Sequence, residues 1–140
     1  MNAVHLQIPA VADYIDLVRL CLTGVATKLN YSYEEIEDMQ VAVSEACNNA
    51  VLHGGNASGR HVIDISFEPV EEGLMTKVIN YGPPFAYQEA VGSGASLRSE
   101  EPEELRAGGL GIYLMEALMD EVHVQSDEDA TEVKLIKYRV

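Results

Sequence analysis

The sequence predicts an α+β fold, a two-layer sandwich in which three helices cover one face of a mixed, mostly antiparallel sheet. Two observations support this prediction. Helical periodicity fills most of residues 11–53, whereas strand-forming segments appear once before this region and then in two later pairs joined by turns. A doubly wound parallel fold would need single strands that alternate with helices. The 140 residues suit one domain, 1–140, with one hydrophobic core.

The first half of the chain is expected to form a short strand and two helices. Residues 4–8 alternate apolar and polar side chains and stop at a proline, which is typical of an edge strand. Apolar side chains recur every three or four positions over 11–29, which predicts an amphipathic helix of about five turns. Ser32 and Glu35 have the spacing of a capping box, and acidic residues crowd the following turn. A second helix is therefore expected over 33–53, where two glycines end it.

The later strands are expected to form two hairpins. Residues 61–67 and 74–79 are rich in strand-forming side chains and flank a Glu-Glu-Gly turn. Residues 122–125 and 131–138 have the same character and flank an Asp-Glu-Asp turn. Two short antiparallel pairs are thus predicted to contribute most of the sheet.

Between the hairpins lies a long segment without periodicity, residues 82–108, which contains prolines, glycines, serines and an acidic run. A stretch of this length inside a compact domain is usually a lid or a binding loop, or is disordered. Gly109 begins a third helix, which is expected to continue to about Met119. Its apolar face is predicted to consist of Leu110, Leu114, Ala117 and Leu118.

Composition excludes several classes of partner. Nine Lys and Arg residues against 23 Asp and Glu residues give a formal net charge of −14. Such a surface repels nucleic acids and anionic membranes, so neither is expected as a partner, and it suits a basic protein. No segment has the apolar length of a membrane span, and no signal-peptide pattern opens the chain. Cys21 and Cys47 lie among apolar neighbours, which favours reduced thiols and, with the other signals, a cytoplasmic location.

A stripe of polar side chains runs along the second predicted helix. Glu45, Asn49 and His53 are spaced four residues apart, so each step turns only about 40° around the helix. Val41 and Leu52 flank Glu45, which suggests a helix that is apolar nearly all round, with the carboxylate and the amide largely buried. Such burial costs several kcal/mol unless something pairs with these groups. One interpretation is a site for a hard cation such as Mg²⁺; the other is a surface face with a solvated glutamate.

Glycines mark two further candidate sites. Gly108, Gly109 and Gly111 open the third helix, where backbone N–H groups and the helix dipole can bind an anion, although a flexible turn is the alternative. Asn80 and Gly82 directly follow a strand, and Asn80 offers both a donor and an acceptor, although an ordinary strand end is the alternative. In a chain this acidic, a phosphate ligand needs such local amide donors and a metal ion.

These features occur in the order of the N, G1 and G2 boxes of the ATP-binding fold shared by histidine kinases, gyrase and MutL. Within that superfamily the chain resembles the RsbW-type anti-sigma factors, most clearly in RLCLTGVATKLNYSYEEIEDMQVAVSEACNNAVLHG and GGLGIYLMEALMDEV. The resemblance implies a Bergerat-type sandwich and a protein serine kinase that uses ATP and Mg²⁺. It also implies a partner switch, in which a homodimeric kinase phosphorylates a serine of an anti-anti-sigma (STAS-type) protein and sequesters a sigma factor.

The resemblance further implies roles for single residues. Glu45 would be the general base that takes the serine hydroxyl proton, and Asn49 would bind the Mg²⁺ that bridges the triphosphate. Thr131 matches a threonine near the adenine, and Asn80 and Gly82 belong to the box that contacts the base. The phosphates would lie against Gly108, Gly109 and Gly111, under a lid formed by about residues 86–107.

Two residues depart from the pattern of the family. Asn80 stands where the G1 box normally begins with an aspartate, whose carboxylate accepts a hydrogen bond from the adenine amino group. An amide oxygen can still accept, but without charge assistance, at a cost of about 1 kcal/mol. Pro84 stands at the second glycine of that box. We therefore expect weaker or less adenine-selective nucleotide binding, and the alternative function is a non-catalytic anti-sigma module that binds nucleotide poorly.

Overall fold

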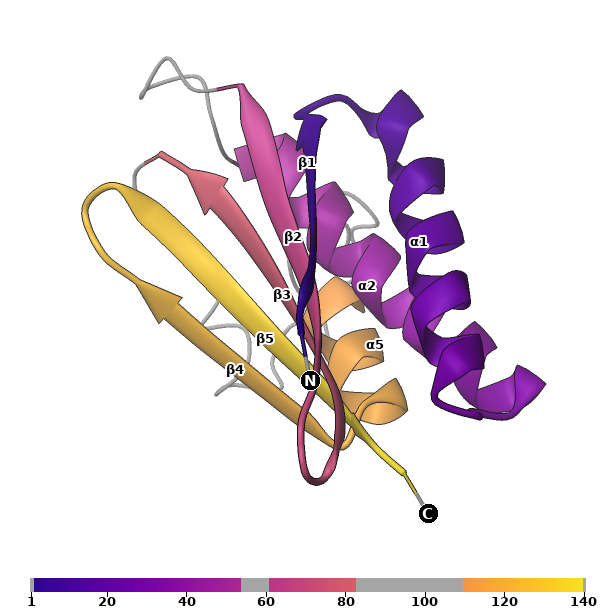
Figure 1. Ribbon diagram of the computed structural model, residues 1–140. Helices are drawn as coiled ribbons and strands as arrows, with labels where there is room; N and C mark the ends of the chain where they lie inside the picture. Colours follow the sequence, from indigo (N-terminus) through magenta and orange to yellow (C-terminus); the bar gives the residue numbers. More distant parts are fainter. Residues whose placement is uncertain (1, 54–60, 83–109, 140) are drawn as a thin grey trace.

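The computed structural model describes residues 2–53, 61–82 and 110–139, which form one sheet with helices packed on one of its faces (Figure 1). This arrangement confirms the predicted α+β two-layer sandwich. The helices are α1, Ile15–Lys28, α2, Tyr33–His53, and α5, Leu110–Leu118. The strands are β1, Val4–Pro9, β2, Val62–Pro69, β3, Gly73–Tyr81, β4, Glu121–Ser126, and β5, Ala130–Tyr138, in the order β1-β2-β3-β5-β4.

All four pairings between these strands are antiparallel, which corrects the expectation of a partly parallel, mixed sheet. Two of the pairings are the expected hairpins, β2 with β3 and β4 with β5. The pairing of β1 with β2 follows from the two helices between them. Because α1 leads away from the end of β1 and α2 leads back, the chain re-enters the sheet where it left and runs in the opposite direction (Figure 1).

The two N-terminal helices agree closely with the sequence prediction. The first differs only at its start, where Ala12–Tyr14 form one 3₁₀ turn before α1 begins at Ile15. The second has the predicted bounds and the predicted capping box. The Glu35 N–H donates to the Ser32 hydroxyl at 3.1 Å, and the Ser32 N–H donates to the Glu35 carboxylate at 2.9 Å. This cap fixes the residue at which α2 begins, and therefore where its side chains lie.

The acidic turn between β4 and β5 is closed by one of its own side chains. Asp127 Oδ1 accepts hydrogen bonds from the backbone N–H groups of Asp129, at 2.8 Å, and Ala130, at 2.9 Å. This confirms the turn predicted from the sequence. The lid expected at about residues 86–107 lies outside the described residues, as do Gly108 and Gly109.

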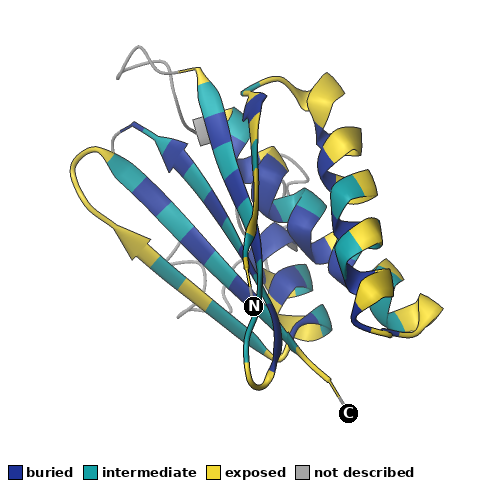
Figure 2. Ribbon diagram, in the orientation of Figure 1, coloured by how far each residue is buried: buried dark blue, intermediate teal, exposed yellow. Residues whose placement is uncertain are grey.

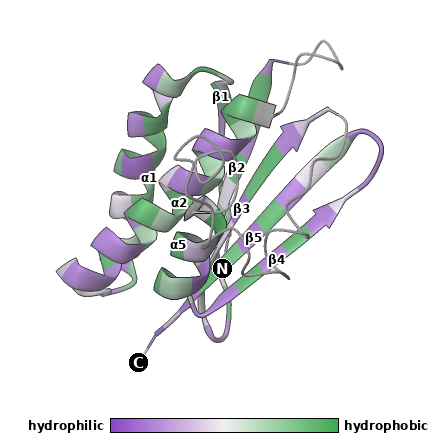
Figure 3. Cartoon of the chain, turned by 180° about the vertical axis from the view of Figure 1, so that it is seen from behind, coloured by the Kyte–Doolittle hydropathy of each residue, from purple (hydrophilic) through white to green (hydrophobic). Residues whose placement is uncertain are grey.

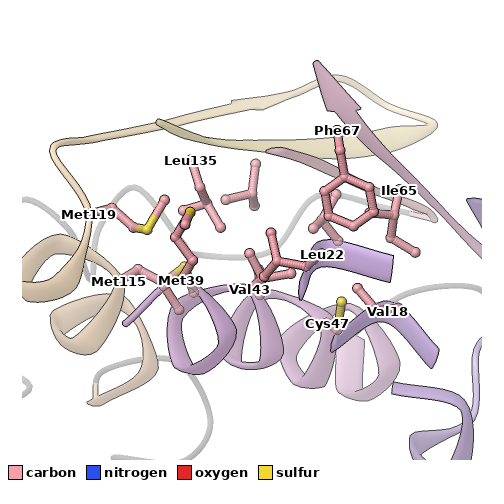
Figure 4. Close-up of a cluster of buried hydrophobic side chains, with 14 of the residues drawn as sticks. Val18, Leu22, Met39, Val43, Cys47, Ile65, Phe67, Met115, Met119 and Leu135 are labelled. Carbon is pink, nitrogen blue, oxygen red and sulfur yellow. The ribbon is translucent and has the colours of Figure 1, made fainter. Parts of the chain in front are cut away.

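The hydrophobic core fills the layer between the sheet and the helices, whereas the outer side of α1 is exposed (Figure 2). Phe67 and Leu135 from the sheet are fully buried with Leu22 of α1 and Met39 of α2 (Figure 4). Hydrophobic and hydrophilic residues alternate along β4 and β5 (Figure 3). The helix-facing side of the sheet therefore supplies the core, and the other side of the sheet is covered by no described element.

The apolar face expected for the third helix is wrong in part. The fully buried side chains of α5 are Ile112 and Met115, and Met119 is buried directly after the helix, whereas Ala117 is exposed. The predicted Leu114 and Leu118 are only half-buried. Because α5 carries apolar side chains on nearly every side, periodicity alone does not select the face that packs.

The described residues also bear on the cysteines and on membrane segments. Cys21 and Cys47 are free thiols, as expected, and burial raises the pKa of Cys47 to about 12, so that thiol stays protonated at neutral pH. No helix within residues 2–53, 61–82 or 110–139 is long and apolar enough to cross a membrane.

The sheet tolerates no side chain at Gly73, the first residue of β3. A Cβ atom there would lie 2.0 Å from the Lys137 carbonyl oxygen and 2.7 Å from the Tyr31 hydroxyl. We expect Gly73→Ala to lower the free energy of unfolding by about 2–3 kcal/mol, measured by urea denaturation. The matched control is Gly24→Ala on α1, where a Cβ would meet nothing within 4 Å and should stabilise the helix by about 1 kcal/mol. Equal stability of the two variants would show that the backbone around Gly73 accommodates a side chain after all.

Candidate functional site

Helix α2 places Glu45 and Asn49 at the boundary between the core and the surface. Asn49 is only 2% exposed, and Glu45 is half-buried. The expected largely buried setting is confirmed for Asn49 but holds only in part for Glu45, because its neighbours Val41 and Leu52 are 43% and 63% exposed. Glu45 is therefore neither a solvated surface residue nor sealed in the core, which is the setting that a reactive carboxylate requires.

The beginning of α5 faces this part of α2 at very short range. A Cβ atom on Gly111 would lie 3.1 Å from Glu45 Oε2 and 3.2 Å from Asn49 Nδ2. Such distances are tighter than ordinary van der Waals contact, so the absence of a side chain at Gly111 is what allows the two helices to approach. The structure therefore brings together three of the residues singled out from the sequence, Glu45, Asn49 and Gly111.

Asn49 has unsatisfied hydrogen-bonding capacity. Its Nδ2 atom is buried and has no hydrogen-bond partner in the described part of the protein. A buried amide left unpaired costs about 1–3 kcal/mol, so its retention calls for a partner. The nitrogen and oxygen of an asparagine side chain are interchangeable by a half-turn, so the same amide can donate to a phosphate oxygen or bind a metal ion through its oxygen.

The residues present fit a metal ion that is held mainly by a ligand rather than by the protein. Among the described residues, no group of three or more His, Cys, Asp or Glu side chains could hold a metal ion. Mg²⁺ commonly takes one or two protein oxygens together with substrate phosphates and waters. Asn49 with Glu45 nearby matches that pattern, whereas a structural site formed only by protein ligands does not.

The Glu45 carboxyl group is tuned by its surroundings. Burial raises the pKa of Glu45 above its ordinary value. A carboxylate with a raised pKa binds a proton more tightly, which makes it a better general base near neutral pH. Both the position and the pKa shift of Glu45 therefore suit proton transfer.

A second polar cluster lies on the helix-facing side of the sheet. Asn80 on β3 pairs with Thr131 on β5, and their side chains are 2% and 0% exposed. Asn80 Nδ2, like Asn49 Nδ2, is buried without a hydrogen-bond partner in the described ranges. Gly82 follows with a φ of 144°, which favours glycine, and its N–H donates to the Asp129 carbonyl at 2.7 Å. The structure thus joins Asn80 and Thr131, which are far apart in the sequence.

The sequence prediction missed Ser126 in this cluster. Ser126 pairs with Thr131 across β4 and β5, and their hydroxyl oxygens are 3.3 Å apart. Strict register around a three-residue Asp-Glu-Asp turn would have placed Ser126 opposite Ala130, whereas the observed register centres the turn on Glu128 and Asp129, so the sequence alone does not reveal this pair. Helix α2, which carries Glu45 and Asn49, packs against both α5 and β3, the strand that carries Asn80.

Comparison with known proteins agrees with this arrangement. The profile of the histidine kinase-like ATPase domain matches residues 8–137. A protein of Bacillus velezensis named serine-protein kinase RsbW is 42% identical over 139 residues, which cover 99% of this chain and 86% of the relative. The protein of the same name from Bacillus subtilis is 40% identical over 136 residues, which cover 96% of this chain and 84% of the relative.

A solved structure shows the same fold. The crystal structure of the RsbU and RsbW domains of a Mycobacterium tuberculosis protein matches with a TM-score of 0.69 at 19% identity. The match covers 99% of this chain and 32% of that longer chain. At this identity the similarity concerns the fold alone.

The raised pKa of Glu45 predicts how stability depends on pH. Because the folded protein holds the Glu45 proton more tightly than the unfolded chain does, the free energy of unfolding falls as pH rises through the ionisation of Glu45. We expect Glu45→Gln to be more stable than the parent protein at pH 8 and to lose this advantage below about pH 4. Urea midpoints from pH 4 to pH 8 measure this, with Glu37→Gln, an exposed position on the same helix, as control. A Glu45→Gln variant that is less stable at pH 8 would contradict it.

Proposed function

The chain belongs to the histidine kinase-like ATPase family, in which it is an RsbW-type serine-protein kinase of a partner switch, and we propose that Glu45, Asn49 and Gly111 form its catalytic site. As a member of this family it uses ATP. We further propose that residues 1–140 act as a single ATPase domain. The phosphoacceptor is a serine of an anti-anti-sigma protein.

One observation carries the proposed site: a Cβ atom on Gly111 would lie 3.1 Å from Glu45 Oε2 and 3.2 Å from Asn49 Nδ2, so α5 approaches both side chains at this glycine. This contact brings the candidate base Glu45 and the candidate metal ligand Asn49, both on α2, next to the beginning of α5. Phosphoryl transfer requires mainly positioning and charge neutralisation, so these groups are chemically sufficient.

Glu45 acts as the general base in the proposed reaction. The serine hydroxyl oxygen attacks the γ-phosphorus of ATP, the bond from that phosphorus to the β,γ-bridging oxygen breaks, and ADP leaves. The hydroxyl proton moves to the Glu45 carboxylate. Burial supports this role because it raises the pKa of Glu45, while the exposed Val41 and Leu52 beside it leave a side from which a protein substrate can approach.

Asn49 and the beginning of α5 bind the triphosphate in this proposal. Asn49 would hold Mg²⁺, which neutralises charge on the phosphate oxygens when it is bound. Backbone N–H groups of the glycine-rich start of α5 would donate to the phosphates. Local donors of this kind are required because the net charge of −14 otherwise repels an anionic ligand.

The proposed partners follow from the same charge. We propose that the acidic surface binds a basic surface of a sigma factor and that the kinase acts in the cytoplasm, where ATP and sigma factors occur. Phosphorylation adds nearly two negative charges to the anti-anti-sigma protein. The acidic kinase then repels its product, which favours release.

A homodimer is proposed through the side of the sheet opposite the helices. The register places Met75 of β3 beside Ile136 of β5 on that side, with Ile79 farther along β3. These apolar side chains lie among polar ones, and no described element covers them. A second copy of the chain would bury them.

The alternative function is a non-catalytic anti-sigma module that binds nucleotide poorly. It is favoured by one observation, the buried amide of Asn80 in place of a carboxylate, because an amide accepts a hydrogen bond from adenine without charge assistance. A phosphotransfer assay distinguishes the two functions, because a non-catalytic module transfers no phosphate.

Replacement of the general base should abolish transfer while ATP still binds. We expect Glu45→Gln to lower kcat for transfer from radiolabelled ATP to the serine of a recombinant STAS-type partner by about 10²-fold or more. The dissociation constant for ATP should change little. Glu37→Gln, exposed on the same helix, should keep full activity. Unchanged phosphotransfer by Glu45→Gln would contradict the assigned role.

Replacement of the metal ligand should remove the effect of Mg²⁺ on binding. In the parent protein, chelation of Mg²⁺ is expected to weaken ATP binding about tenfold or more, because the ion screens the phosphates. In Asn49→Ala the same chelation should change affinity by no more than about threefold, measured by calorimetry. The neighbouring exposed Asn48→Ala is the control and should keep the full Mg²⁺ effect. An equal Mg²⁺ effect in Asn49→Ala and the parent protein would show that Asn49 is not the ligand.

A further inference from the structure

The cluster of Asn80, Thr131 and Ser126 has a composition that points to an uncharged ligand. It offers an amide and two hydroxyl groups and contains no charged side chain. Phosphates are expected at the other cluster, where Asn49 and Gly111 lie. The uncharged parts of a nucleotide are the base and the ribose, and the adjacent donor and acceptor of an amide match the edge of a base.

The amide of Asn80 requires a partner that can accept a hydrogen bond. Its side chain is 98% buried, since only 2% is exposed, and Nδ2 has no partner among the described residues. A carboxylate at this position could only accept hydrogen bonds, whereas an amide always presents a donor beside its acceptor. The Asn80 amide can therefore pair with bases that a carboxylate at the same position cannot.

Both common purine edges complement an amide. Adenine presents a 6-amino donor beside the N1 acceptor, and a 6-oxopurine presents a 6-carbonyl acceptor beside the N1–H donor. An amide can pair with either edge, because a half-turn of the side chain exchanges its donor and its acceptor. A carboxylate and the 6-carbonyl oxygen are both acceptors, so they cannot form a hydrogen bond with each other. Both groups would then be buried without a partner, and a site with a carboxylate would bind such a base poorly.

From these features we propose that Asn80 makes the nucleotide site permissive for 6-oxopurine nucleotides, so that the kinase binds GTP and ITP as well as ATP. This inference rests on the proposed nucleotide site and specifies its substrate class. Asn80 acts as a residue that determines base specificity, and Thr131 with Ser126 completes the polar wall beside it.

The test is calorimetric titration of the full chain with ATP and with ITP in the presence of Mg²⁺. ITP isolates the effect of the 6-carbonyl group, because it lacks the 2-amino group of GTP. The parent protein is expected to bind the two nucleotides with dissociation constants within about tenfold of each other. Asn80→Asp should keep ATP binding and discriminate against ITP by about 100-fold. Ser32→Ala, at the distant cap of α2, is the control and should leave the ratio unchanged.

The outcomes separate this inference from the proposed function. A parent protein that binds ATP at least about 100-fold more tightly than ITP would overturn the inference and leave the kinase function intact. Binding of neither nucleotide would overturn the proposed function and the inference together. The ratio of the dissociation constants for ITP and ATP, measured on the parent protein, tests the inference even if Asn80→Asp does not fold.

Discussion

The approach of α5 to α2 at Gly111 is the contact on which the geometry of the site depends. It holds the first turn of α5 against Glu45 and Asn49 of α2. The approach is so close that a Cβ atom added to Gly111 would lie 3.1 Å from Glu45 Oε2 and 3.2 Å from Asn49 Nδ2. The far end of α5 is fixed separately, because Lys137 Nζ donates to the Leu118 carbonyl at 2.7 Å and lies 3.8 Å from Asp38 of α2. With both ends held, α5 cannot slide along α2 without breaking one of these contacts.

Helix α2 and strand β3 each bury a polar group that has no hydrogen-bond partner among the described residues. Asn49 and Asn80 each bury an amide nitrogen without a partner within the described ranges, and Glu45 is partly desolvated. Each such group reduces stability, because burial removes water without supplying a replacement. Natural proteins retain costs of this kind chiefly at functional sites, where a ligand supplies the missing contact. The stability lost here is therefore consistent with a site adapted to bind a nucleotide.

Local sequence signals predicted most of the fold and part of the site. The capping box of Ser32 and Glu35 predicted where α2 begins, and Asp127 marked the last turn, because these interactions involve residues close in sequence. The packed face of α5 was not predictable, since apolar side chains surround that helix. The pairing of Asn80 with Thr131 depends on the order of strands in the sheet, and the exposure of Val41 and Leu52 depends on which elements cover α2. Periodicity contains neither kind of information.

The central claim is that a metal-bound nucleotide lies where α2 meets the beginning of α5. Nuclear magnetic resonance with Mn²⁺ in place of Mg²⁺ tests it directly, because the paramagnetic ion broadens signals only in its vicinity. With ADP and Mn²⁺ bound, the side-chain amide of Asn49 and the backbone amide of Gly111 should broaden strongly, while Gly73, at the other end of β3, should not. Broadening centred on the uncovered face of the sheet, with Asn49 and Gly111 unaffected, would contradict the claim.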